Sequence, residues 1–117
     1  MPFSTIVRKI INRYGRELIR RERIETIEEN ERVYTYGDPE IVHGQVSPLT
    51  GYAESWEMPG LKIRAEYLVT FAPGTEIEVG DLLKIGDEWT EVVEKLERRT
   101  GASIDFIECL CRRREAA

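Results

Sequence analysis

Turn signals containing glycine or proline recur at short intervals through the second half of the sequence. The clearest are Pro73-Gly74, Gly80-Asp81, Gly86-Asp87 and Thr100-Gly101. Glycine permits positive φ and aspartate bonds nearby backbone, so these pairs can reverse the chain tightly. The apolar segments between them are short, which favours strands joined as antiparallel hairpins. The spacing therefore predicts a mainly β fold, built as a small antiparallel barrel or sandwich.

The clearest strand spans residues 61–71. Apolar residues alternate with polar ones at nearly every position, the apolar set being Leu61, Ile63, Ala65, Tyr67, Val69 and Phe71. One face is expected to pack in the core, and the other, with Lys62, Arg64 and Glu66, to meet water or a partner. Further strands are expected at residues 82–85, 89–96 and 104–111.

Residues 4–15 predict a short amphipathic helix before the strands. Ser4 can cap it, Gly15 can end it, and one apolar stripe runs through Ile6, Val7, Ile10, Ile11 and Tyr14. A helix this short is marginal alone, so the stripe must dock. It can dock on the sheet of its own domain or on a neighbouring subunit.

After this helix the apolar residues no longer follow a helical spacing. Residues 18–28 are rich in β-branched and charged side chains, with imperfect alternation. Residues 33–36 and 41–46 read as two further strands. The turn residues Gly37-Asp38-Pro39 lie between them and predict a hairpin.

Residues 47–60 show no period and contain two prolines and two glycines, which predicts a long inter-strand loop. The segment also carries four large apolar side chains, Leu49, Tyr52, Trp56 and Met58. Aromatic residues and methionine are enriched at interface cores. The loop either offers these side chains to a partner or folds back and buries them on its own domain.

The length of 117 residues and the apolar fraction of 41% suit one small domain. We expect the helix within residues 1–16, the domain in 17–112 and a charged tail at 113–117. No apolar run is long enough for a bilayer, and the N-terminus lacks the regions of a signal peptide. We expect no membrane contact. The net charge of −5 argues against a general nucleic-acid coat. Arginines cluster at 16–23 and 112–114, where solvation of a surface is the simpler interpretation.

Residues for catalysis are scarce, so we expect no enzyme, no cofactor and no metal. His43 is the only histidine, and no nucleophile elbow or phosphate-binding glycine loop is present. Asp38, Glu40 and His43 could form a metal site only by chance proximity in so acidic a chain. Cys109 and Cys111 are two residues apart on one strand, which suits reduced thiols better than a disulfide.

An oligonucleotide-binding β-barrel is the main alternative function. Such barrels hold single strands with exposed aromatic rings beside basic residues. Tyr34, Tyr36 and Tyr67 with Arg64 could provide that surface. The acidic balance of the chain weighs against it.

The order of these features resembles a known family. The opening helix ends in Ile10-Ile11-Asn12-Arg13-Tyr14-Gly15, and Gly44-x-Val46-x-Pro48-Leu49-Thr50 precedes the long loop. Thr75-Glu76-Ile77-x-Val79-Gly80-Asp81 then leads to Gly86-Asp87-x-Trp89-x-x-Val92. In this order and spacing the chain resembles the head-completion (stopper, or head–tail joining) proteins of tailed bacteriophages and prophages. The apolar loop and the cysteines depart from the family pattern.

The resemblance implies an SH3- or OB-like β-barrel with a short N-terminal helix and a long inter-strand loop. It implies a virion protein, assembled in the host cytoplasm, that forms a homo-oligomeric ring between the portal or adaptor protein and the tail proteins. Double-stranded DNA would pass through the ring without sequence-specific binding, and the ring would help to retain it. Leu49, Tyr52, Trp56 and Met58 would form a docking or gating loop. Subunit contacts would then involve Ile6, Ile10, Tyr14, Lys62, Arg64 and Glu66.

Overall fold

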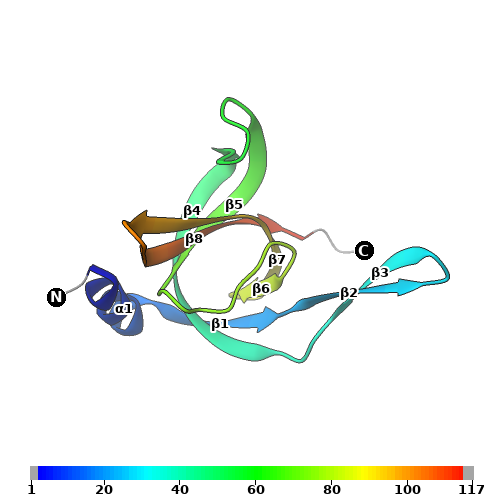
Figure 1. Ribbon diagram of the computed structural model, residues 1–117, viewed down its shortest axis with the longest axis horizontal. Helices are drawn as coiled ribbons and strands as arrows, with labels where there is room; N and C mark the ends of the chain where they lie inside the picture. Colours follow the sequence, from blue (N-terminus) through cyan, green and yellow to red (C-terminus); the bar gives the residue numbers. More distant parts are fainter. Residues whose placement is uncertain (1–2, 115–117) are drawn as a thin grey trace.

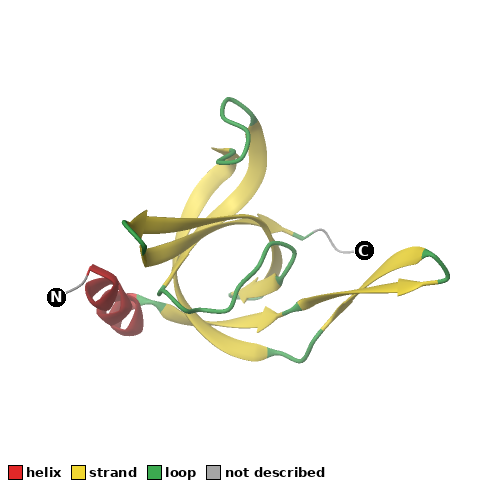
Figure 2. Cartoon of the chain, in the orientation of Figure 1, coloured by secondary structure: helices red, strands yellow, loops and turns green. Residues whose placement is uncertain are grey.

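The computed structural model describes residues 3–114 of the chain, with side chains from Thr5 to Arg114 (Figure 1). The elements are α1 (Phe3–Tyr14), β1 (Arg16–Arg21), β2 (Arg23–Glu28), β3 (Glu31–Tyr36), β4 (Glu40–Glu54), β5 (Lys62–Phe71), β6 (Leu82–Ile85), β7 (Glu88–Thr100) and β8 (Ser103–Arg113). Strands dominate the described chain (Figure 2), so the prediction of a mainly β fold with a short helix is confirmed. Within residues 3–114, no helix combines the length and apolar character needed to span a bilayer.

Six strands form a sheet whose hydrogen-bonded neighbours close into a ring. Their order is β1-β4-β5-β8-β7-β6, and β6 pairs again with β1. Every pairing is antiparallel. We call these six strands the closed sheet. β2 and β3 pair only with each other and project from it (Figure 1).

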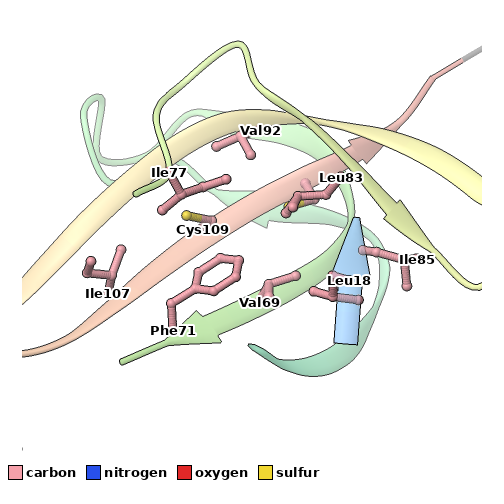
Figure 3. Close-up of a cluster of buried hydrophobic side chains, with 10 residues drawn as sticks. Leu18, Val69, Phe71, Ile77, Leu83, Ile85, Val92, Ile107 and Cys109 are labelled. Carbon is pink, nitrogen blue, oxygen red and sulfur yellow. The ribbon is translucent and has the colours of Figure 1, made fainter. Parts of the chain in front are cut away.

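The core fills the inside of the closed sheet (Figure 3). The buried cluster comprises Leu18, Val69, Phe71, Ile77, Leu83, Ile85, Val92, Ile107, Cys109 and Cys111. Alternation places Val69 and Phe71 inside, as the pattern of residues 61–71 predicts. Burial of a Phe71-sized side chain stabilises a fold by about 2–3 kcal/mol.

Both cysteines are free thiols within this core. Burial raises the pKa of Cys111 to about 12 and raises the pKa of Cys109 further, with the neighbouring Cys111 adding to that rise. The thiolate is therefore suppressed at neutral pH, and both groups are chemically inert.

Helix α1 lies outside the closed sheet, against β4, β5 and β8. Ile11 is its anchor, with 1% of the side chain exposed, and Val7 is half-buried beside it. Gly15 ends the helix as predicted, its amide donating to the Ile11 carbonyl at 2.8 Å. A Cβ at Gly15 would lie 2.4 Å from that oxygen, so only glycine fits this exit. The expected cap at Ser4 lies outside the described side chains.

The predicted hairpin of residues 33–36 with 41–46 is wrong. β3 pairs with β2, and β4 pairs with β1 and β5. The reversal occurs earlier, at Glu29 and Asn30, whose φ values of 50° and 65° are those of a two-residue type I′ turn. The expected strand-like segment 18–28 is consequently two strands, β1 and β2. Gly37-Asp38-Pro39 instead connects the hairpin back to the closed sheet.

The prediction of a loop over residues 47–60 is also wrong in extent. β4 continues to Glu54, and only residues 55–61 connect it to β5. The register shifts between Pro48 and Gly51, so two residues of β4 face one residue of β5. This bulge breaks the alternation that would otherwise reveal a strand. At the other end, β8 reaches Arg113, and residues 115–117 of the expected tail lie outside the described residues.

Candidate interaction surfaces

The first surface is the β4–β5 arm, residues 49–66, which extends beyond the last strands that flank it (Figure 1). Its tip, residues 55–61, is fastened to β7 by the buried carboxylate of Glu94. Ser55 Oγ donates to Glu94 Oε2 at 2.6 Å, and the Trp56 amide donates to Oε1 at 2.8 Å. The Glu57 amide reaches the same Oε1 at 3.3 Å. These three hydrogen bonds fasten the first residues of the tip to β7.

The four predicted contact side chains of this segment differ in exposure. Tyr52 and Met58 are 65% and 61% exposed, whereas Leu49 and Trp56 are half-buried. Ser55 is buried, so part of the segment does fold back on its own domain. The chain itself thus partly covers Leu49 and Trp56, and contact of the segment with a partner stays a prediction. The arm exposes two large apolar side chains, Tyr52 and Met58.

The base of the arm carries the charged residues expected at subunit contacts. Lys62 and Arg64 are exposed, and Glu66 is half-buried. Arg64 Nε donates to Glu66 at 2.8 Å, and the Arg113 amide donates to the same carboxylate at 2.7 Å. Burial alone would raise the pKa of Glu66, but these two hydrogen bonds outweigh it and hold the pKa below its usual range. Glu66 and Arg64 thus bond within the chain, and Lys62 is the most available of the three.

The second surface is the outer side of α1. Of the predicted stripe, Ile11 and Val7 face the sheet, and the subunit-contact candidates Ile6, Ile10 and Tyr14 lie 41%, 43% and 67% exposed. Ile10 and Ile11 border a shallow apolar hollow of about 170 Å³ between α1 and the sheet. The helix therefore docks on its own domain through one edge and leaves a second apolar edge outside.

The third surface, the hairpin β2–β3, was missed from the sequence. It is a two-stranded ribbon with Ile27 74% exposed near its turn, and Ile24 and Tyr34 41% and 44% exposed. An isolated hairpin of two strands is marginal in water. The Glu29-Asn30 turn between two segments of β-branched residues was the signal that could have revealed it.

The base of this hairpin is fastened by Asp81. One oxygen of Asp81 accepts from the amide of Arg23, the first residue of β2, at 3.0 Å. The other accepts from Arg20 Nε at 2.8 Å and from the Glu78 amide at 2.9 Å. Arg20 also pairs with Glu40. Arg20 is only 3% exposed, so this member of the expected solvated arginine cluster is instead a buried structural residue.

The suggested metal ligands do not converge. Glu40 pairs with the buried Arg20. His43 lies three residues along β4, half-exposed, with Glu17 on the paired strand 3.8 Å away. Among residues 3–114, no group of three or more histidine, cysteine or carboxylate side chains is placed to hold a metal ion.

The residues suggested for oligonucleotide binding are divided between two sheets. Tyr34 and Tyr36 lie on β3, while Tyr67 lies on β5 and donates to Glu88 at 3.2 Å. The two β3 rings already carry cations, Arg23 over Tyr34 at 4.6 Å and Arg114 over Tyr36 at 5.2 Å. The three tyrosines therefore do not form one stacking platform.

The comparisons with known proteins add no relative. No protein-family model matches the chain, and no curated protein is significantly similar to it.

Proposed function

We propose that the chain is a structural subunit of the neck of a tailed phage or prophage, a head-completion protein. It forms a ring that joins the portal or adaptor protein to the tail and helps to retain packaged DNA. Its closed sheet would be a small barrel of the SH3- or OB-like kind. The observation that carries the proposal is the division of the molecule into one packed core and three outlying surfaces: the β4–β5 arm, α1 and the hairpin β2–β3 (Figure 1).

A division into a packed core and outlying surfaces suits a structural subunit of a larger assembly. A subunit between two other rings needs contacts on both sides and along its own ring, and its core serves only to hold those contacts in position. The order and spacing of the sequence motifs support the same class of protein. The acidic balance is compatible with DNA passage, because a duplex should not adhere to the channel and repulsion at physiological salt extends only about 8 Å.

The arm is the proposed contact with the neighbouring ring. Glu94 holds the tip that carries Met58, and the β4–β5 ladder holds Tyr52 opposite Arg64, so both side chains are presented without a large ordering cost on binding. Such preorganised aromatic and methionine side chains are favourable anchors in an interface core.

Electron microscopy of phage heads that carry portal and adaptor but lack this protein tests the proposal. Added protein should produce one further ring of density and should slow DNA loss. The double variant Tyr52→Ala/Met58→Ala should bind the heads at least about tenfold more weakly, the loss expected for two interface anchors. Ile41→Ala is the matched control, because Ile41 is 63% exposed but lies outside the arm. Absence of added density with the native chain would refute the proposal.

Oligonucleotide binding by the same chain predicts a different result. Association with single strands would weaken steeply with salt and would fall on Tyr34→Ala or Tyr36→Ala. Lack of binding at low salt would remove this alternative.

A further inference from the structure

The hairpin β2–β3 has two open edges. Its strands pair with each other over six residue pairs and with no other strand among residues 3–114 (Figure 1). The ribbon contains no proline and its register contains no bulge, two features that commonly blunt an edge strand. A two-stranded ribbon is marginal in water, and an open edge is a template for a further strand. The ribbon is therefore suited to extension into a larger sheet.

Principles of antiparallel pairing define which backbone groups point away from the ribbon. The Gly37 amide donates to the Glu22 carbonyl at 2.9 Å, so hydrogen-bonded pairs recur at every second position from there. At the positions between them, backbone groups point outward. The Arg23 amide accordingly donates to a carboxylate outside the ribbon, and the Tyr36 carbonyl accepts from an arginine of β1. By the same alternation, the amides and carbonyls of four further residues point outward: Glu25, Ile27, Arg32 and Tyr34.

The outward groups of the two edges match each other. Glu25 lies opposite Tyr34, and Ile27 lies opposite Arg32, so both edges carry their outward groups at the same positions along the ribbon. When two ribbons lie side by side in the same orientation, the β3 edge of one faces the β2 edge of the other and runs antiparallel to it. Both positions can then form hydrogen-bonded pairs between the chains. The backbone of a second copy is thus complementary to these edges.

The side chains favour contact between unlike edges. Glu25 and Arg32 share one face of the ribbon, where Arg32 Nε lies 3.2 Å from Glu25 Oε1. Their side chains are still 45% and 72% exposed, so Arg32 can also reach the Glu25 of a neighbouring copy diagonally across the new pair. Two β2 edges would instead bring two Glu25 carboxylates together, and two β3 edges would bring two Arg32 guanidinium groups together. Charge therefore selects a β3 edge against a β2 edge.

We propose that the β3 edge of one subunit adds to the β2 edge of the next copy of this chain. This inference rests on the proposed ring and specifies its subunit contact. A contact between two different edges of identical chains is heterologous and repeats from subunit to subunit, closing into a ring when the rotation allows. The exposed Ile27 of one copy then lies diagonally from the Tyr34 ring of the next, and both gain cover. At the end of the ribbon, Glu28 lies opposite the neighbour's Glu31, as it does within the hairpin, which keeps each single contact weak.

Cysteine trapping between two singly substituted chains tests this pairing. Between the chains, Thr26 of one copy and Val33 of the next form a pair of the close, non-hydrogen-bonded type. Their Cα atoms are then about 4.5 Å apart, a distance that a disulfide spans. The native thiols do not interfere, because Cys109 and Cys111 are buried and inert.

A chain with Thr26→Cys and a chain with Val33→Cys are mixed at high concentration and mildly oxidised. Mass spectrometry of the products should find mainly the disulfide between positions 26 and 33. Each chain oxidised alone should give little covalent dimer. Absence of the 26–33 linkage, or a predominance of 26–26 or 33–33 linkages, would overturn the proposal.

A charge swap supplies the matched control. Glu25→Arg/Arg32→Glu keeps an ion pair within the hairpin but reverses the charge that each edge presents. When only the Thr26→Cys chain carries the swap, its β2 edge meets a β3 edge of like charge. The rate of 26–33 trapping should then fall about three- to tenfold. When both chains carry the swap, trapping should recover. An undiminished rate in the unmatched mixture, or no recovery in the matched one, would contradict the contact.

Hydrogen exchange in the native chain gives a second measurement that needs no cysteine. The outward amides have no partner strand in dilute protein. Under the trapping conditions, four of them should gain protection of at least about tenfold: Glu25, Ile27, Arg32 and Tyr34. The Thr26 amide, already bonded within the hairpin, is the internal control and should change less. Unchanged exchange at the four outward amides would equally refute the pairing.

The two proposals fail in different ways. If the native chain adds a ring to phage heads but matched and unmatched mixtures trap equally, the neck function stands and this contact is wrong. If the 26–33 linkage forms as expected but heads gain no ring, the contact stands and the neck function is wrong.

Discussion

The β4–β5 arm and the hairpin β2–β3 are both two-stranded projections, but they are fastened at opposite ends. Glu94 ties the tip of the arm to β7 through one side-chain and two backbone donors. Asp81 ties the base of the hairpin to the closed sheet through Arg20 and the Arg23 amide. The arm is therefore fastened near its outer end, whereas the outer end of the hairpin depends on its own ladder and turn.

One small domain can in this way offer two kinds of contact. A tip held by a buried carboxylate is preorganised and suits recognition of a fixed surface. A ribbon held only at its base can adjust its outer end when it meets a neighbour.

Asp81→Ala should lower the free energy of unfolding by about 3–5 kcal/mol, because it leaves the buried Arg20 without its principal partner. The amides of Arg23 and Glu78 also lose their acceptor. Urea denaturation measures the change. Asp87→Ala is the control, since Asp87 is exposed in a turn and its loss should cost about 0.5 kcal/mol or less.

A comparable loss in both variants would show that Asp81 is no special anchor of the hairpin base. If Asp81→Ala unfolds the chain outright, Asp81→Asn is the milder test, because an amide oxygen can still accept one of these hydrogen bonds. It should recover part of the lost stability.

Some elements of the fold could be predicted from the sequence and others could not. The helix and the strands β5 to β8 were predicted closely, because periodicity and turn residues are local properties. The partner of β3 was not predicted, because the Glu29-Asn30 turn is less distinctive than Gly37-Asp38-Pro39. The continuation of β4 was hidden by the bulge after Pro48.

The buried charges were missed for a different reason. Nothing in the sequence around Arg20 or Glu94 distinguishes them from the many exposed charges nearby. Their burial depends on groups that lie 61 residues away for Arg20 and 39 residues away for Glu94. Exposure of Tyr52 and Met58 was predicted as one of two outcomes. The projecting hairpin β2–β3 was not predicted, because it depends on the missed turn at Glu29 and Asn30.

Glu94→Ala should loosen the tip of the arm. It removes the acceptor for Ser55 Oγ and for two backbone amides, a loss of about 2–3 kcal/mol in the local free energy of opening. Hydrogen exchange should lose protection over residues 55–61 and keep it in the hairpin β2–β3. Glu91→Ala is the control, because Glu91 on the same strand pairs with exposed Arg112 at 3.3 Å and has no other side-chain partner among residues 3–114. Unchanged exchange at residues 55–61 would contradict the assigned role of Glu94.

Glu29→Gly should act on the hairpin in the opposite direction. Glu29 has a φ of 50°, a region that disfavours residues with a Cβ and that glycine adopts freely. The substitution should therefore stabilise the hairpin by up to about 1 kcal/mol, slowing exchange of its ladder amides. Glu25→Gly, within β2, should instead destabilise the ribbon, since glycine weakens a strand interior. Equal effects of both variants would exclude the turn as the source of strain.

The smallest predicted effect is on the pH dependence of the unfolding free energy, and it concerns Glu66 at the base of the arm. The pKa of Glu66 is held below its ordinary value of about 4.5 by bonds from Arg113 and Arg64. The folded state therefore binds the proton less readily than the unfolded chain. The stabilisation that ionised Glu66 contributes is fully present above its ordinary pKa. It is lost as the pH falls through the lowered pKa of the folded state. Glu66→Gln should accordingly flatten part of the fall in unfolding free energy as the pH drops below about 4.5. Identical slopes in the native chain and Glu66→Gln would mean that the bonds to Glu66 do not fasten the arm.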